Sequence, residues 1–189
     1  MESISTTLTL PVYIELNNEE LEKINIKGLK SRLKNECADL YKQYHNVLID
    51  IVNKKITITA VEYLHPYPHP IEGGKKEKIK YRVFKFITTP DYPFRPPEIY
   101  VNNLTYLSIL KMSGDYEKNM VKKLKGQDCL CCHSLNCNAN WSPAIRLNRI
   151  IDEIKDTLKF KRDVINLLLA QKIKKRYNIP YAYIEEYLA

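Results

Sequence analysis

The chain has 189 residues, a length that suggests one domain with room for a substantial core. Hydrophobic residues make up 44% and charged residues 28%, which is typical of a globular protein. The net charge is +8, but the lysines are spread among acids and no basic run is interleaved with aromatic residues as a nucleic-acid groove requires. We therefore expect a basic surface and no nucleic-acid partner.

The first residues, "MESISTTLTLPVYIEL", lack the basic start and the unbroken apolar stretch of a signal peptide. No apolar run approaches the length of a membrane span. We expect an intracellular protein, cytoplasmic or nuclear, with no membrane partner and with reduced cysteines.

The first half of the chain predicts a helix followed by an antiparallel meander. Residues 7–16 form an extended segment, and a single apolar stripe marks a helix over about residues 27–45, with Cys37 among its core positions. Three strands follow, in "NVLIDIV", "KKITITAVEY" and "KIKYRVFKFITT". In the third strand Ile79, Tyr81, Val83 and Ile87 share one parity. "DYPFRPPEIYVNN" is a proline-stiffened turn that leads into a fourth, short strand.

The second half is mainly helical. Residues 104–125 predict helical structure with a break at Gly114. An apolar stripe from Leu147 to Leu158 marks a helix with Ser142 as its N-cap and Pro143 at its first position. Two further helices are expected, over about residues 161–175 and within "NIPYAYIEEYLA". A meander flanked by helices is an α+β domain.

Between these halves lies "GQDCLCCHSLNCNANWSP", which contains four of the five cysteines, Cys129, Cys131, Cys132 and Cys137. The segment is a metal site, a disulfide-linked loop or a loop around one reactive thiol. A reducing compartment weighs against disulfides, and the adjacent Cys131 and Cys132 would need an unusual geometry to bridge.

Three motifs in a fixed order carry a resemblance to a known family. "PIEGG" (70–74), "DYPFRPPEI" (91–99) and "WSPA" (141–144) resemble signature segments of ubiquitin-conjugating enzymes. The resemblance covers about residues 27–175, and leaves 1–26 and 176–189 as terminal extensions. It implies an N-terminal helix, a four-stranded antiparallel meander, an active-site loop and C-terminal helices.

The resemblance also implies a function. Gly126, Cys129 and Leu130 match the family's Gly-x-x-Cys-Leu segment, so Cys129 would accept ubiquitin or a ubiquitin-like modifier as a thioester from an activating enzyme. It would then pass the acyl group to a lysine or to a cysteine of a ligase. No cofactor is implied, because ATP is used by the activating enzyme.

The match has departures that leave alternatives open. Cys129 lies twelve positions before Trp141, against about eight in the family, whereas Cys132 lies nine before it and is the alternative nucleophile. Cys131 replaces the family's aspartate. Both Cys131 and Cys137 are interpreted as buried small residues or as modulators of the thiol. The family's His-Pro-Asn tripeptide is absent, which affects direct transfer to lysine more than transfer to a ligase thiol. Candidates for the missing oxyanion support are Asn136, Asn138 and Asn140.

Two partner surfaces are also implied by the resemblance. The ligase would dock on Phe94, Pro143 and Ala144. The activating enzyme would meet the basic face of the first helix, which carries Lys27, Lys30, Arg32 and Lys34.

Two other interpretations remain. Cys129 and Cys132 form a C-x-x-C pair, and together with His65 and His69 they would make a tetrahedral zinc site. The motif departures also fit a catalytically inactive binding or assembly module of the same fold, with or without that zinc.

Overall fold

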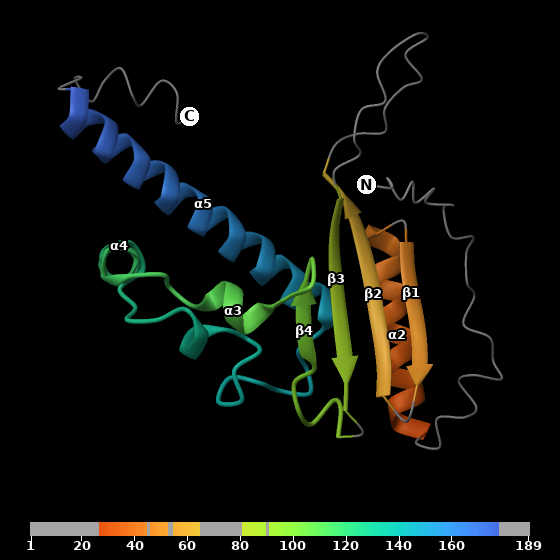
Figure 1. Ribbon diagram of the computed structural model, residues 1–189. Coiled ribbons are helices and arrows are strands. Elements are labelled where there is room, and N and C mark those ends of the chain that lie inside the picture. Colours follow the sequence, from red (N-terminus) through yellow and green to blue (C-terminus); the bar gives the residue numbers. More distant parts are fainter. Residues whose placement is uncertain (1–26, 45, 53–54, 65–80, 90, 178–189) are drawn as a thin grey trace, which may run out of the picture. The chain divides into compact units, whose positions relative to one another are not determined.

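The computed structural model describes residues 27–44, 46–52, 55–64, 81–89 and 91–177, shown in Figure 1. The chain divides into two compact units, Met1–Asn103 and Leu104–Ala189. The expected N-terminal strand, the last short helix and both candidate zinc histidines, His65 and His69, lie outside the described residues. The extent of a single domain over residues 27–175 stays a prediction.

The first unit contains one helix and an antiparallel meander, in the predicted order. Its elements are α2 (Lys27–Gln43), β1 (Asn46–Val52), β2 (Lys55–Tyr63), β3 (Tyr81–Thr88) and β4 (Glu98–Val101). The sheet has the order β1-β2-β3-β4-β5, with β5 only two residues long (Leu104–Thr105). Sequence patterns missed β5, which follows a turn of Asn102 and Asn103 with φ of 48° and 68°. Asparagine tolerates this left-handed conformation better than most residues.

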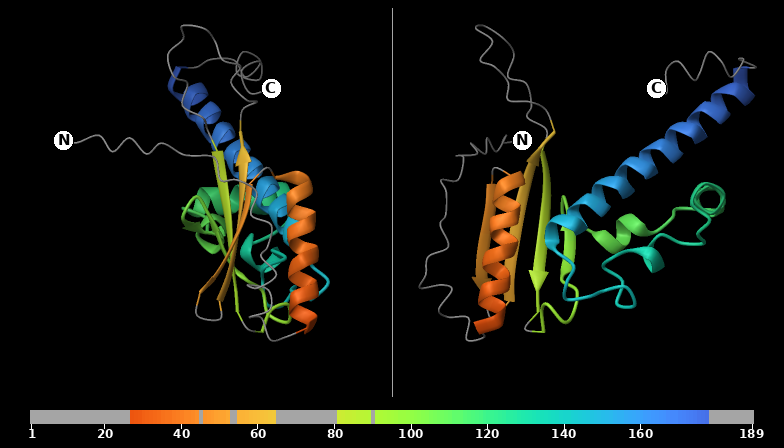
Figure 2. Two further views of the ribbon diagram at one scale, coloured as in Figure 1. Left: turned by 90° about the vertical axis from the view of Figure 1, so that its right-hand side faces the viewer. Right: turned by 180° about the vertical axis from the view of Figure 1, so that it is seen from behind.

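The α+β class is confirmed, and the core of the first unit lies between α2 and one face of the sheet. Figure 2 shows α2 running along β1 and β2. Ile58, Phe84 and Phe86 are fully buried, and Ile58 pairs with Phe86 across β2 and β3. The predicted helix stripe is buried as well, with Leu29, Leu33, Cys37, Leu40 and Tyr44 each at most 6% exposed. Burial, helped by the charge of Glu36, raises the pKa of Cys37 to about 12, so this thiol is an inert core residue.

Strand β3 buries Phe84 and Phe86, on the parity opposite to that of Tyr81, Val83 and Ile87. Phe84 and Phe86 point into the core, whereas Tyr81 is 46% exposed. The pairing of β2 with β3 explains why Phe84 faces the core. Phe84 lies opposite Ala60, whose small side chain leaves room for an aromatic ring. The edge of Tyr44 packs against that ring, with centroids 6.1 Å apart.

The second unit is helical. It contains α3 (Tyr106–Leu110), α4 (Asp115–Lys125), a 3-10 turn η1 (Cys131–His133) and α5 (Leu147–Tyr177). The break at Gly114 is confirmed, since this glycine is the N-cap of α4. No helix in the described part of the chain is long and apolar enough to cross a membrane.

Two predictions about α5 were wrong. Ser142 is not its N-cap, because the Ser142 hydroxyl accepts from the Ala144 N–H (3.3 Å) and its carbonyl from the Ile145 N–H (2.9 Å). These bonds form a local turn, and the helix begins only at Leu147. The expected separate helix over 161–175 is the continuation of α5, since no glycine or proline interrupts the sequence between Leu147 and Tyr177.

A buried ion pair ties the proline-rich turn of the first unit to α2. Arg32 Nε lies 2.6 Å from Glu36 Oε1, and the Glu36 side chain is fully buried. Tyr92, in the turn before β4, donates its hydroxyl to the same oxygen (3.1 Å). Burial and the Glu36 charge raise the pKa of Tyr92, so the phenol stays protonated and remains a donor.

We predict that Arg32→Ala lowers the free energy of unfolding by about 3 kcal/mol, because it leaves the buried Glu36 carboxylate without its cation. Tyr92→Phe removes one hydrogen bond and should cost about 1 kcal/mol. Lys34→Ala, at an exposed position of the same helix, is the matched control and should change stability by less than about 0.5 kcal/mol. Urea unfolding monitored by circular dichroism measures all three. Equal losses for Arg32→Ala and Lys34→Ala would contradict the account.

Candidate active site

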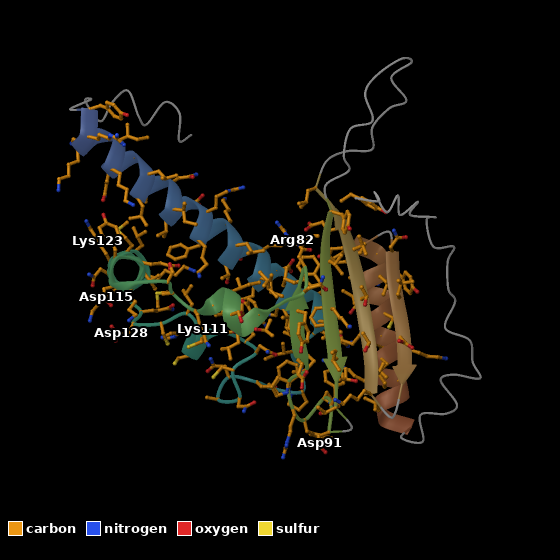
Figure 3. All side chains as sticks on the ribbon, in the orientation of Figure 1. Arg82, Asp91, Lys111, Asp115, Lys123 and Asp128 are labelled. Carbon is orange, nitrogen blue, oxygen red and sulfur yellow. The ribbon has the colours of Figure 1, made fainter. Side chains whose placement is uncertain are left out.

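The cysteine loop, residues 126–141, begins where α4 ends. Gly126 terminates the helix with φ of 66°, a conformation that glycine adopts without strain, and its N–H bonds to the Lys122 carbonyl (2.9 Å). Lys122 also pairs with Asp128 through their exposed side chains (3.0 Å). Figure 3 labels Asp128 just beyond α4, which carries Asp115 and Lys123. The chain therefore enters the loop in a defined direction immediately before Cys129.

Three thiols lie together in this loop. Cys131 Sγ is 3.5 Å from Cys129 Sγ and 3.9 Å from Cys132 Sγ, and all three sulfur atoms lie within 4.8 Å of one another. All three are free thiols, with Cys132 exposed and the other two half-buried. We call them the thiol trio. Cys131 was expected to be a buried small residue or a modulator of the thiol, and its sulfur is within hydrogen-bonding distance of the nucleophile candidate.

Hydrogen bonds within the trio shift the pKa values of Cys129 and Cys132 in opposite directions. Hydrogen bonds from the Cys132 thiol and backbone, and then from the Cys131 thiol, lower the pKa of Cys129. The hydrogen bonds of Cys132 with Cys129, and then with Cys131, raise the pKa of Cys132 to about 12. Of the two nucleophile candidates, Cys129 therefore ionises at lower pH than Cys132, which makes it the more nucleophilic thiol at neutral pH.

A single carboxylate on α5, Glu153, binds the loop directly after η1. Glu153 Oε1 accepts from the Ser134 hydroxyl (2.6 Å) and from the Tyr106 hydroxyl (2.8 Å). Glu153 Oε2 accepts from the Leu135 N–H (2.7 Å). Ser134 is only 3% exposed, so the η1 turn that carries Cys131 and Cys132 ends in a fixed anchor. Burial, and then the charge and hydrogen bond of Glu153, help keep the Tyr106 pKa above its usual value, so this phenol stays a donor.

Sequence reasoning missed Glu153. The available signal was its position three residues after the buried Ile150, beside the apolar stripe of α5, where an acid needs partners. A neighbouring acid, Asp152, lies on the exposed face instead.

The three candidate asparagines occupy different environments. Asn140 donates its side-chain N–H groups to the carbonyls of Cys132 (2.8 Å) and Ser134 (3.0 Å), so it braces the loop. Asn136 has a buried side-chain oxygen without a hydrogen-bond partner, and Asn138 is exposed. Oxyanion support by any of them stays a prediction.

The proposed docking residues are accessible where the structure describes them. Phe94, in the first unit, is 79% exposed, and Pro143 and Ala144 are exposed in the second unit. In the same turn as Phe94, Asp91 and Arg95 form a surface ion pair (3.5 Å), and Figure 3 labels Asp91. On α2, Lys34 is exposed whereas Arg32 faces Glu36. The side chains of Lys27 and Lys30 lie outside the described residues.

Comparison of the chain with protein-family models, with curated proteins and with solved structures gives no match.

We predict that Glu153→Gln loosens the cysteine loop. In either orientation of the new amide, the Leu135 N–H loses its charged acceptor, because it faces either a neutral oxygen or the N–H₂ group, at a cost of about 2 kcal/mol. Hydrogen exchange at the Leu135 amide should accelerate in this variant. Asp152→Asn is the matched control and should leave exchange unchanged. Unaltered protection in Glu153→Gln would show that the carboxylate is not the anchor.

A second prediction concerns thiol reactivity. At neutral pH, iodoacetamide should alkylate Cys129 before Cys132, although Cys132 is the more exposed thiol, because the reagent attacks the thiolate. Peptide mapping by mass spectrometry at short times measures the order. Raising the pH should narrow the difference as Cys132 ionises. If Cys132 is modified first at neutral pH, the assignment of the thiolate to Cys129 is wrong.

Proposed function

We propose that the chain is a thioester carrier of the ubiquitin-conjugating type, with Cys129 as the acceptor of ubiquitin or a ubiquitin-like modifier. One observation supports this proposal above others: Cys129 is a free, partly accessible thiol, and Cys131 directs an S–H at its sulfur from 3.5 Å. A sulfur stabilised as a thiolate is the group that attacks an acyl carbonyl.

The arrangement around the thiol supports the same function. Gly126 and Leu130 keep the spacing of the family's active-site segment, and the buried Leu130 (6% exposed) leaves Cys129 at the surface side of the loop. In the first unit, an N-terminal helix followed by an antiparallel meander is the order that the family's fold requires. The exposed Phe94 in the proline-rich turn fits a docking surface for a ligase.

The chemical step is an exchange of thioesters. The Cys129 thiolate attacks the carbonyl carbon that joins the modifier to the activating enzyme's cysteine, and a new C–S bond forms as the old one breaks. The departing cysteine leaves as a thiolate and takes the proton that Cys129 released. In the second step, a ligase thiolate or a lysine amine attacks the Cys129 thioester. A thiolate needs less help than an amine, so transfer to a ligase cysteine suits a loop without the family's asparagine.

A second candidate is a catalytically inactive module of the same fold. The observation that favours it is the engagement of Asn140, which donates to two loop carbonyls and so has no N–H groups left for an oxyanion. Such a module would bind modifier or ligase without forming a thioester.

Incubation with activating enzyme, ATP and modifier, followed by a non-reducing gel, tests the proposal. We expect an adduct that reductant cleaves and that persists in Cys132→Ser and Cys137→Ser. In Cys129→Ser this reductant-sensitive adduct should be absent, and any adduct still formed should be an ester that resists the reductant.

Two outcomes count against the proposal. An adduct that depends on Cys132 and not on Cys129 would move the nucleophile. The absence of an adduct with every modifier tested, in protein whose circular dichroism shows a folded chain, would favour the inactive module.

A further inference from the structure

The thiol trio has the donor set and the spacing of a metal site, independently of any acyl transfer. Three sulfur atoms within 4.8 Å of one another are close to what one ion can bind. With Zn–S bonds of about 2.3 Å in a tetrahedron, neighbouring sulfurs lie roughly 3.8 Å apart. The two closer separations in the trio, 3.5 and 3.9 Å, are near this value. The remaining pair needs to close by at most about 1 Å, which a side-chain rotation supplies.

The loop is preorganised for such an ion. Gly126 and the Lys122–Asp128 pair fix the chain before Cys129, and Glu153 fixes it at Ser134, directly after η1. Asn140 holds the Cys132 carbonyl. Ligands that are already placed lose little conformational freedom when the ion binds, which favours affinity.

We infer that Cys129, Cys131 and Cys132 bind a thiophilic d10 cation, Zn²⁺, through three sulfurs, with the fourth coordination position open to solvent. Soft thiolate ligands select zinc over magnesium or calcium. Among the described His, Cys, Asp and Glu residues, these three alone form such a group, and Cys132 is exposed, so a water can complete the tetrahedron. Binding displaces whatever protons the three sulfurs still carry, and the site of one Zn²⁺ and three thiolates then has one net negative charge.

This ligand set differs from the one that the sequence suggested. The residue spacing predicted zinc ligands at Cys129, Cys132, His65 and His69, without Cys131. In the structure Cys131 is the central member, within 4 Å of both neighbours. Zinc binding would engage the Cys129 sulfur, so the ion and an incoming acyl group exclude each other.

The test uses the full chain, reduced and freed of metal, titrated with ZnCl₂ alone. We expect one zinc ion per chain to remain bound through gel filtration, as measured by atomic absorption. Co²⁺ in place of zinc should give the visible bands of a tetrahedral site and a sulfur-to-metal charge-transfer band. Cys131→Ser should lose the bound metal and the charge-transfer band, whereas Cys137→Ser, a free cysteine of the same loop outside the trio, should keep both.

Further experiments distinguish the three-sulfur zinc site from a site that uses the histidines and from the proposed thioester function. The double variant His65→Ala, His69→Ala should keep the zinc, and loss of zinc in that variant would overturn the three-sulfur site. Failure of the wild-type chain to retain zinc or cobalt would overturn the inference while leaving thioester formation open. If metal binds but no thioester forms in metal-free protein, the inference stands and the proposed function fails. Thioester formation at Cys129 in zinc-saturated protein would contradict the shared use of this sulfur.

Discussion

One carboxylate anchors the cysteine loop to α5. Glu153 projects from α5 and accepts hydrogen bonds from a hydroxyl and a backbone N–H of the loop and from a tyrosine of α3. These bonds join three segments that are far apart in the sequence. The η1 turn has its own backbone hydrogen bonds and those of Asn140, but two of its three residues are exposed, and Glu153 links the end of the turn to α5. We therefore expect the positions of the three sulfurs to depend on a residue that takes no part in their chemistry.

Further contacts in the second unit join α4 and α5. On α4, Glu117 accepts from the Ser113 N–H (2.6 Å) and hydroxyl (2.8 Å) and pairs with Lys161 of α5 (3.1 Å). Burial alone would raise the Glu117 pKa, but these hydrogen bonds and the lysine outweigh it and hold the pKa below its usual value. Lys161 also donates to the carbonyl of Lys111, a residue labelled in Figure 3. The helices that enter and leave the cysteine loop are thus cross-linked, and the loop is held between them.

Local patterns in the sequence were sufficient to predict most of the helices and strands. The stripe of α2 and the alternation in β1 and β2 predicted their bounds closely, because each period is a property of a few neighbouring residues. The inward face of β3 was not predictable in this way, since both parities carry apolar residues and the pairing of Phe84 with Ala60 decides between them. The predicted start of α5 was wrong for a similar reason. Serine is a common N-cap residue, but the Ser142 hydroxyl accepts a hydrogen bond within a local turn, and the helix begins later.

Only part of the candidate site could be predicted from the sequence. The segment and its cysteines were evident, but the grouping of Cys129 with Cys131 and Cys132 depends on how the loop turns, and that depends on Glu153. The most direct test of this dependence compares the alkylation rate of Cys129 in the wild-type chain and in Glu153→Gln. If the carboxylate positions the trio, the variant stays folded yet its Cys129 reacts more slowly, at a rate approaching that of Cys137. An unchanged Cys129 rate in a folded Glu153→Gln chain would show that the thiol owes its reactivity to something other than this anchor.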